Sequence, residues 1–214
     1  MAATVTPLLW VCGPRAVGKS WVGYEIFTQL QRDGYRGAYV DLDQLGFCRP
    51  ADPADPDNHR IKAANLAALW PTFRAAGARY LILTGRVPDR ATVDRYAAGV
   101  PDAALTLCRL RVGPDGLTER ILSRGRGGGP PIPGDELVGR PEDELRRLAE
   151  REAADAAELD RAADAAELDR AAHAAELDRA GLGDVRVDTD GLTVAQTARA
   201  VRERTRWPRL DHCG

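Results

Sequence analysis

The stretch that decides the fold reads Leu8-Leu9-Trp10-Val11-Cys12, followed without a break by Gly13-Pro14-Arg15-Ala16-Val17-Gly18-Lys19-Ser20. The first part is a short apolar run typical of a buried strand, and the second matches the phosphate-binding loop (P-loop) pattern Gly-x-x-x-x-Gly-Lys-Ser/Thr in full. In such a loop the backbone N–H groups surround the phosphates, the lysine reaches the terminal phosphates and the serine hydroxyl binds Mg²⁺. We therefore predict that all eight loop residues bind a nucleotide, that Lys19 is also catalytic and that Ser20 is a magnesium ligand.

Two further features favour this interpretation over an ordinary glycine turn between a strand and a helix. Residues 21–30 carry apolar side chains at helical spacing, so a helix follows the loop as the pattern requires. Lys19 and Lys62 are the only lysines in a chain that otherwise places its positive charge on arginine. A lysine therefore stands where phosphate chemistry needs one.

Composition narrows the class of protein. The chain has 214 residues, and we expect a single α/β domain over 1–214. A net charge of -2 argues against a general nucleic-acid or membrane-surface binder, and no apolar run is long enough to span a membrane. Four widely spaced cysteines indicate neither a zinc site nor a disulfide framework. Without a signal-peptide pattern at its N-terminus, the protein is expected to be cytoplasmic.

Two carboxylates end the second predicted strand, which covers residues 38–43. Ligands of open α/β sheets gather at the carboxyl ends of the strands, so Asp41 and Asp43 are expected beside the phosphate loop. Alternation along a strand places both side chains on one face. The alternative is that both aspartates only cap the strand end or the next helix.

The proline-rich segment 49–57 cannot form a regular element, and it is either an acceptor-binding loop or a linker. A helix is predicted over 58–76. Its residues Arg60, Lys62 and Asn65 lie off the apolar stripe, so they either reach the site or face solvent.

Three more predicted strands, 80–85, 104–112 and 184–189, alternate with helices. This order indicates right-handed crossovers and a parallel, doubly wound sheet. The third strand ends in Thr84-Gly85-Arg86, which is expected to face the same crevice as the phosphate loop. In this architecture the loop after the fifth strand lies near the phosphate loop, and its candidates for contact with the nucleotide base are Thr189, Asp190 and Gly191.

A short helix over 117–124 leads into the glycine-rich segment 125–131. An arginine-bearing, glycine-rich hinge beside a phosphate site suits a lid, expected over about 113–134, that closes over the nucleotide and excludes water. A disordered surface loop with solvated arginines is the alternative. The candidates for neutralising charge on the transferred phosphoryl group are Arg120, Arg124 and Arg126.

Nine residues, Ala153–Arg161, recur unchanged at 162–170 and, with His173 as the single change, at 171–179. A proline before this region and a glycine after it predict one helix over about 141–180. Each repeat advances the helix by about two and a half turns, so successive leucines point in opposite directions and no leucine seam forms. We expect a largely solvated helix, and weak association of two chains through the alanines into a homodimer is the alternative.

With these landmarks the chain resembles the small-molecule kinases of the P-loop superfamily, which include shikimate kinase, gluconate kinase, adenylylsulfate kinase and chloramphenicol phosphotransferase. The matching residues are the phosphate loop, Asp41-Leu42-Asp43, the lid arginines and the turn Val187-Asp188-Thr189-Asp190-Gly191. The resemblance implies an α/β fold, a three-layer P-loop NTPase sandwich around a five-stranded parallel sheet, with an Arg/Gly-rich lid and a long Ala-rich helical insertion. It also implies ATP and Mg²⁺, with Asp43 taking the acceptor's proton and Asp41 in the magnesium shell.

The expected function is therefore ATP-dependent transfer of the γ-phosphate to a hydroxyl group of a small-molecule acceptor whose identity stays open. A nucleoside or nucleotide kinase is one alternative. The other is a nucleotide-dependent switch or assembly protein that uses the long helix as a partner surface. The arginine- and alanine-rich composition suits a bacterium with GC-rich DNA.

Overall fold

The structure, a computed structural model, describes residues 5–87, 89–129, 135–172 and 185–208, and for 159 and 162–172 only the course of the helix. In this part of the chain five parallel strands form one sheet in the order β2-β3-β1-β4-β5. The predicted α/β class with a five-stranded parallel sheet is confirmed. The strands are β1 Thr6–Cys12, β2 Gly37–Asp41, β3 Tyr80–Thr84, β4 Ala103–Arg111 and β5 Val185–Asp188.

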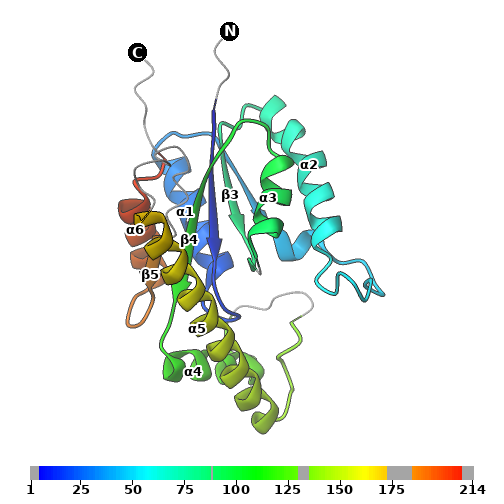
Figure 1. The fold of residues 1–214 in the computed structure, drawn as a ribbon, viewed down its shortest axis with the longest axis vertical. Helices are drawn as coiled ribbons and strands as arrows, with labels where there is room; N and C mark the ends of the chain where they lie inside the picture. The colour runs from blue at the N-terminus through cyan, green and yellow to red at the C-terminus, as the bar shows by residue number, and fades with distance from the viewer. Residues whose placement is uncertain (1–4, 88, 130–134, 173–184, 209–214) are drawn as a thin grey trace.

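Helices cover both faces of the sheet and make three layers, as Figure 1 shows. Side chains along β1 alternate between the two faces, with Leu8 and Trp10 in one buried cluster and Leu9 and Val11 in the other. This double burial explains why the run before the phosphate loop is apolar throughout. On the first face lie α2 (His59–Ala75) and α3 (Arg90–Ala98), and on the second lie α1 (Lys19–Arg32) and α6 (Val194–Thr205).

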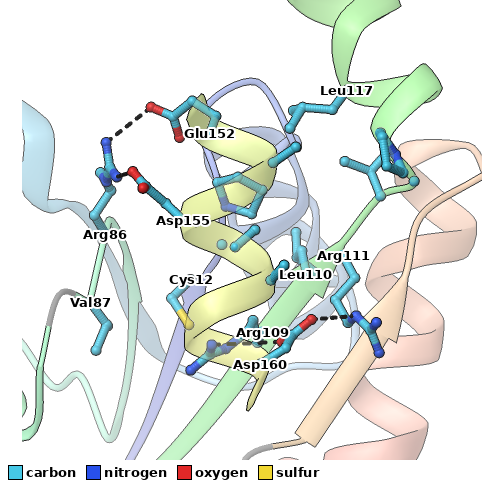
Figure 2. A pocket seen from close by; sticks show the side chains of 18 of the residues that line it. Cys12, Arg86, Val87, Arg109, Leu110, Arg111, Leu117, Glu152, Asp155 and Asp160 are labelled. Atoms are coloured by element: carbon cyan, nitrogen blue, oxygen red, sulfur yellow. Dashed lines mark hydrogen bonds and ion pairs between the residues drawn. The ribbon is translucent and has the colours of Figure 1, made fainter. Parts of the chain in front are cut away.

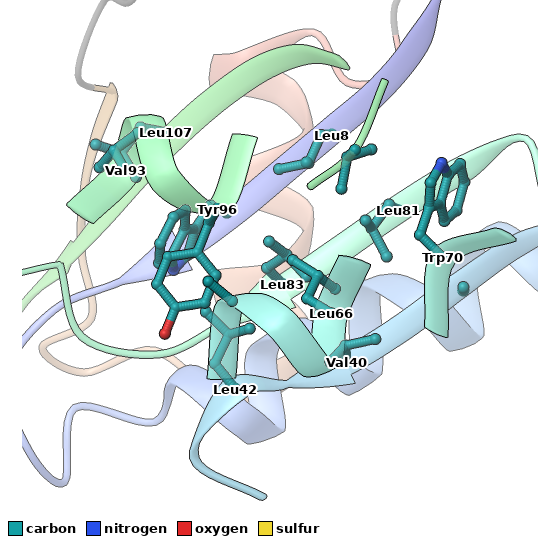
Figure 3. Packing of buried hydrophobic residues seen from close by; sticks show 14 of the residues in the cluster. Leu8, Val40, Leu42, Leu66, Trp70, Leu81, Leu83, Val93, Tyr96 and Leu107 are labelled. Atoms are coloured by element: carbon teal, nitrogen blue, oxygen red, sulfur yellow. The ribbon is translucent and has the colours of Figure 1, made fainter. Parts of the chain in front are cut away.

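The cluster on the first face is built from large side chains (Figure 3). The Trp10 and Tyr96 rings meet edge to face, 5.0 Å between centroids, and Leu66 and Trp70 of α2 are each at most 1% exposed. Shortening a side chain such as Leu66 to alanine costs about 2–5 kcal/mol of stability in a close-packed core. The core therefore holds the carboxyl ends of the strands, where the functional residues stand, in fixed positions.

The second strand is shorter than predicted. β2 ends at Asp41, and Leu42–Leu45 form one turn of 3-10 helix. Asp41 caps this turn, because its Oδ1 accepts the Asp43 backbone N–H at 3.0 Å. The prediction that strand alternation puts Asp41 and Asp43 on one face is therefore wrong, since Asp43 lies in the turn, although both residues line the same cavity.

The helix that carries the repeats packs against the body of the protein. α5 (Glu142–Ala172) lies beside α4 (Pro114–Gly125), and its Leu145 and Ala149 are buried together with Leu117. From there α5 runs back past β4 (Figure 1). Most side chains over 142–157 are exposed, as predicted, but the prediction missed the apolar residues before the repeats that anchor the helix to α4. The predicted end near 180 lies outside the described residues.

The first repeat also contacts the sheet. Asp160 lies 2.9 Å from Arg111 Nε and 3.7 Å from Arg109 Nη1, both on β4, as the dashed lines of Figure 2 show. Only 17% of the Asp160 side chain is exposed. The first repeat thus packs one charged residue, Asp160, against β4. The prediction of a solvated helix did not include this contact.

Candidate active site

The phosphate loop lies between the end of β1 and the start of α1. Gly13 has a φ of 143°, and a Cβ there would lie 2.6 Å from the Leu110 carbonyl oxygen, so a side chain does not fit. Gly18, the N-cap of α1, has a φ of 102°, which glycine adopts without strain. Lys19 begins α1, and its Nζ donates to the Pro14 carbonyl at 2.8 Å. The loop therefore folds around a helix N-terminus, which is an arrangement that binds anions.

Charged groups surround the Lys19 side chain. Burial lowers the pKa of its amine below the usual lysine value, a shift that Asp43 and Glu152 oppose and Arg86 reinforces. Phosphates bound at the loop would bring further negative charge and favour the ammonium form. The lysine is thus placed to bind a phosphate as a cation.

One cavity of about 830 Å³ joins the phosphate loop to the end of β2 and to α4. This volume is in the range of small-molecule sites. The cavity brings together predicted residues of the loop, the strand end and the lid, whose roles stay predictions. These residues are Arg15, Ala16, Gly18, Lys19, Ser20, Asp41, Asp43, Arg120 and Arg124. Gly13 and Pro14 line a neighbouring cavity of about 510 Å³ under α5 instead.

The lid arginines differ in what they contact. Arg120 donates to the Val17 carbonyl at 3.1 Å and to Oγ1 and the carbonyl of Thr189 at 2.9 and 3.0 Å, so it joins α4 to the phosphate loop. Arg124 pairs with Asp135 at 2.8 Å. Arg126, just after α4, is exposed and is not among the described residues that line the cavity. Residues 130–134 of the predicted lid lie outside the described residues.

The base-contact candidates follow β5 but do not line this cavity in the part of the chain that is described. Thr189 is buried and holds Arg120. Asp190 Oδ2 accepts the Gly113 N–H at 2.8 Å, beside the start of α4, and Gly191 is exposed with a φ of 69°. Thr189 and Asp190 thus anchor α4, and a contact with the base stays a prediction.

Ser20 and Asp41 offer oxygen atoms to a metal ion. The Tyr39 hydroxyl donates to the Ser20 carbonyl at 3.1 Å, and burial raises the pKa of Tyr39 to about 12, so the phenol stays protonated. Among the described residues, no group of three or more His, Cys, Asp or Glu side chains could hold a metal by itself. Mg²⁺ usually takes one or two protein oxygens together with substrate phosphates and water. Ser20 and Asp41, which line one cavity with Lys19, fit that requirement.

A second lysine reaches the site. Lys62 is 9% exposed, and its Nζ donates to Asp43 Oδ1 at 3.0 Å. The prediction that Lys62 lies off the buried face of its helix is therefore wrong, because an ion pair with Asp43 satisfies the buried ammonium. Arg60 pairs with Asp52, Asn65 donates to a backbone carbonyl, and neither lines the cavity among the described residues.

The proline-rich segment forms one wall of the cavity. Arg49, Pro56 and Asp57 line it. The buried Asn58 donates its Nδ2 hydrogen to the Gly46 carbonyl at 2.9 Å and so ties the segment to the turn after β2. The segment is therefore part of the cavity wall, and acceptor binding by it stays a prediction.

Sequence reasoning missed Glu152 and left Lys62 as one of three candidates. Glu152 is 4% exposed and contacts the phosphate loop. A signal was present, since Glu152 follows Leu145 by seven positions and Ala149 by three, which puts a charge on the apolar stripe of the helix. For Lys62 the signal was the rarity of lysine in this chain.

No family model matches the chain, and no curated protein matches its sequence. Among the described helices, none combines the length and apolar character needed to cross a membrane. Solved structures do match in fold. A sugar kinase from a Janibacter species is 14% identical, with a TM-score of 0.55 over 93% of this chain and 94% of that chain.

Two other solved structures match with similar identities, coverages and TM-scores. The shikimate kinase from Bacteroides thetaiotaomicron is 17% identical, with a TM-score of 0.51 over 92% of this chain and 96% of that chain. The tunicamycin resistance protein from Deinococcus radiodurans is 19% identical, with a TM-score of 0.50 over 92% and 94%. At these identities the likeness is one of fold. At that level the predicted resemblance to small-molecule P-loop kinases is confirmed.

Proposed function

We propose that the chain transfers the γ-phosphate of ATP to a hydroxyl group of a small-molecule acceptor and releases ADP. The observation that carries this proposal is the shared cavity of Lys19, Asp43 and the lid arginines Arg120 and Arg124. A phosphate loop alone serves many kinds of nucleotide hydrolase. A carboxylate in the same cavity adds the group that an alcohol acceptor requires.

Asp43 is the base in this proposal. It takes the hydroxyl proton while the bond from the acceptor oxygen to the γ-phosphorus forms and the bond to the β–γ bridging oxygen breaks. Lys62 holds one oxygen of Asp43, yet 54% of the Asp43 side chain is exposed. The carboxylate is therefore fixed in direction and still open to an acceptor.

The phosphate side uses cations from two elements, α1 and α4. Lys19 stabilises charge on the transferred group, and Arg120 and Arg124 approach it from α4. Ser20 and Asp41 would hold Mg²⁺, which when bound screens the phosphate charge. Two of the structural neighbours are named as a sugar kinase and a shikimate kinase, which agrees with a phosphotransferase.

The acceptor side of the cavity is both aromatic and basic. Trp21 and Phe47 line it and are 44% and 62% exposed, and Arg49 adds positive charge. An acceptor panel should therefore combine sugar alcohols and hydroxy acids with alcohols that carry an aromatic ring. Acceptors with both an apolar part and an anionic group are expected to give the highest rates.

The test measures ADP release with ATP, Mg²⁺ and each acceptor of the panel, and identifies phosphorylated product by mass spectrometry. Acceptor-dependent ADP release that is lost in Lys19→Ala would support the proposal. Its absence across the panel, with ATP bound normally, would count against it.

A nucleotide-dependent switch is the second candidate, and one contact favours it. The helix with the repeats reaches the phosphate loop directly, because Glu152 accepts the Arg15 N–H. In the same assay a switch shows ATP hydrolysis that no acceptor changes. A nucleoside kinase differs from the first proposal only in its acceptor, so nucleosides and nucleotides belong in the panel.

A further inference from the structure

A buried carboxylate from α5 lies against the phosphate loop. Oε2 of Glu152 accepts the backbone N–H of Arg15 at 2.9 Å, and its Oε1 accepts from Arg86 Nη1 at 3.1 Å. The Arg15 Nε lies 3.6 Å from the same Oε1. Figure 2 shows the Arg86 side chain directed at Glu152. One backbone amide and two guanidinium groups thus surround a carboxylate that is 4% exposed.

These donors are of the kind that bind phosphate. The Arg15 amide belongs to the loop whose N–H groups surround nucleotide phosphates. A guanidinium group binds a phosphate in the same forked geometry with which it binds a carboxylate. Glu152 therefore holds its negative oxygens where phosphate oxygens would be received. Two anions cannot share these donors without strong repulsion, so they must compete.

Arg86 is placed to exchange one anion for another. It follows β3, 41% of its side chain is exposed, and it lines both the cavity at the phosphate loop and the cavity under α5. Lys19 lines the first of these cavities as well, and the charge of Arg86 lowers the pKa of its amine. Asp155, the next acidic residue of α5, lies 3.7 Å from Arg86 as a second partner.

We propose that Arg86 binds the terminal phosphate of the nucleotide. Glu152 is a positioning residue that holds Arg86 before the nucleotide binds. It competes with the nucleotide for Arg86 and for the Arg15 amide. ATP displaces the carboxylate, and Arg86 passes from Glu152 to the phosphate. Because Glu152 is part of α5, the exchange also links nucleotide binding to that helix. The inference rests on the nucleotide-binding half of the proposed function and needs no acceptor.

Nucleotide affinity measured without any acceptor tests the competition. A fluorescent ATP analogue gives the Kd, and displacement by ATP and ADP gives theirs. Glu152→Gln keeps the size of the side chain and an oxygen for the Arg15 amide but removes the charge, so ATP should bind about tenfold more tightly. Glu150→Gln, an exposed position of the same helix, is the control and should leave the Kd unchanged. Unchanged or weaker ATP binding in a folded Glu152→Gln protein would overturn the proposal.

A variant of the partly exposed Arg86 tests the proposal even if the Glu152→Gln protein does not fold. Arg86→Gln should weaken ATP binding about tenfold more than ADP binding, because the contact is to the terminal phosphate. Arg151→Gln, exposed on α5, is its control. In the Arg86→Gln background the gain from Glu152→Gln should shrink. An unchanged ratio of ATP to ADP affinity would refute the role of Arg86.

The outcomes of this test and of the kinase test are separable. Affinities that follow the prediction, in a protein without acceptor-dependent ADP release, would leave this inference standing and remove the transfer proposal. Acceptor-dependent release with unaltered affinities in both variants would do the reverse.

Discussion

The phosphate loop and helix α5 meet at one site but reach it by different routes. The loop residues are consecutive, so two glycines and the start of α1 already place Lys19 and Ser20. Glu152 is 137 positions from Arg15 and reaches it only because α5 packs on α4. The contrast teaches that local sequence specifies the phosphate donors, whereas packing of a distant helix decides what else faces them.

The largest effect is expected from a substitution in the phosphate loop. Lys19→Ala should lower phosphoryl transfer at least about a thousandfold, because the ammonium stabilises charge that grows in the transition state. Lys62 is the other lysine at the site, and its ion pair with Asp43 prevents it from acting in place of Lys19. Acceptor-dependent ADP release measures the loss, and far-UV dichroism should barely change. Transfer within about threefold of the parent would remove Lys19 from the mechanism.

Substitutions of the two aspartates at the end of β2 should have the next largest effect. Asp43→Asn is expected to lower turnover by about two to four powers of ten with little change in ATP affinity, as for loss of a general base. Asp41→Asn should instead raise the Mg²⁺ concentration needed for activity. Steady-state kinetics and magnesium titrations separate the two. Weakened ATP binding with intact turnover in Asp43→Asn would mean that the two roles are interchanged.

Lys62, like Glu152, reaches the site by packing, and a smaller effect is expected from it. Lys62→Met should lower turnover about tenfold, because it removes the partner that orients Asp43. Stability should change by about 1 kcal/mol at most, since methionine fills a similar volume in place of a buried charge. In the Asp43→Asn background the same change should have no further effect on turnover. Additive losses in this double-mutant cycle would show that Lys62 acts on something other than Asp43.

The smallest effect is expected from shortening α5 by whole turns. Deletion of 153–170 removes about five turns, and 171–179 then follows Glu152 with the same sequence except for His173. Activity and melting temperature should stay close to those of the parent. Deletion of 153–161 alone removes about two and a half turns, so the helix end leaves on the opposite side and thermal stability should fall.

Melting curves and ADP release distinguish these two deletions. Loss of activity in the longer deletion, with the fold intact by dichroism, would show that the repeats themselves carry function. That result would favour the switch over the kinase. The connection from 173 to 184 lies outside the described residues, so this remains a prediction.

Much of the fold and part of the site could be predicted from the sequence. All five strands were predicted from the sequence, and Asp41 and Asp43 were placed beside Lys19 because parallel strands end at one edge. The end of the second strand was predicted wrongly. The Asp41 side chain accepts the Asp43 N–H and caps a turn there, so the strand ends at Asp41. The exposed position of Arg126 could not be predicted, because it depends on where α4 ends.

The sequence by itself determined the phosphate loop and the charged groups at the strand ends, because these follow from spacing within a few residues. It also determined the α/β class, because strand and helix patterns alternate along the chain. Only the tertiary structure decided that Lys62 pairs with Asp43 and that Glu152 lies at the phosphate loop. Both are buried charges, and a buried charge is stable only where a partner from another element meets it. Such a partner cannot be seen in local sequence, since it depends on how helices distant in the chain pack together.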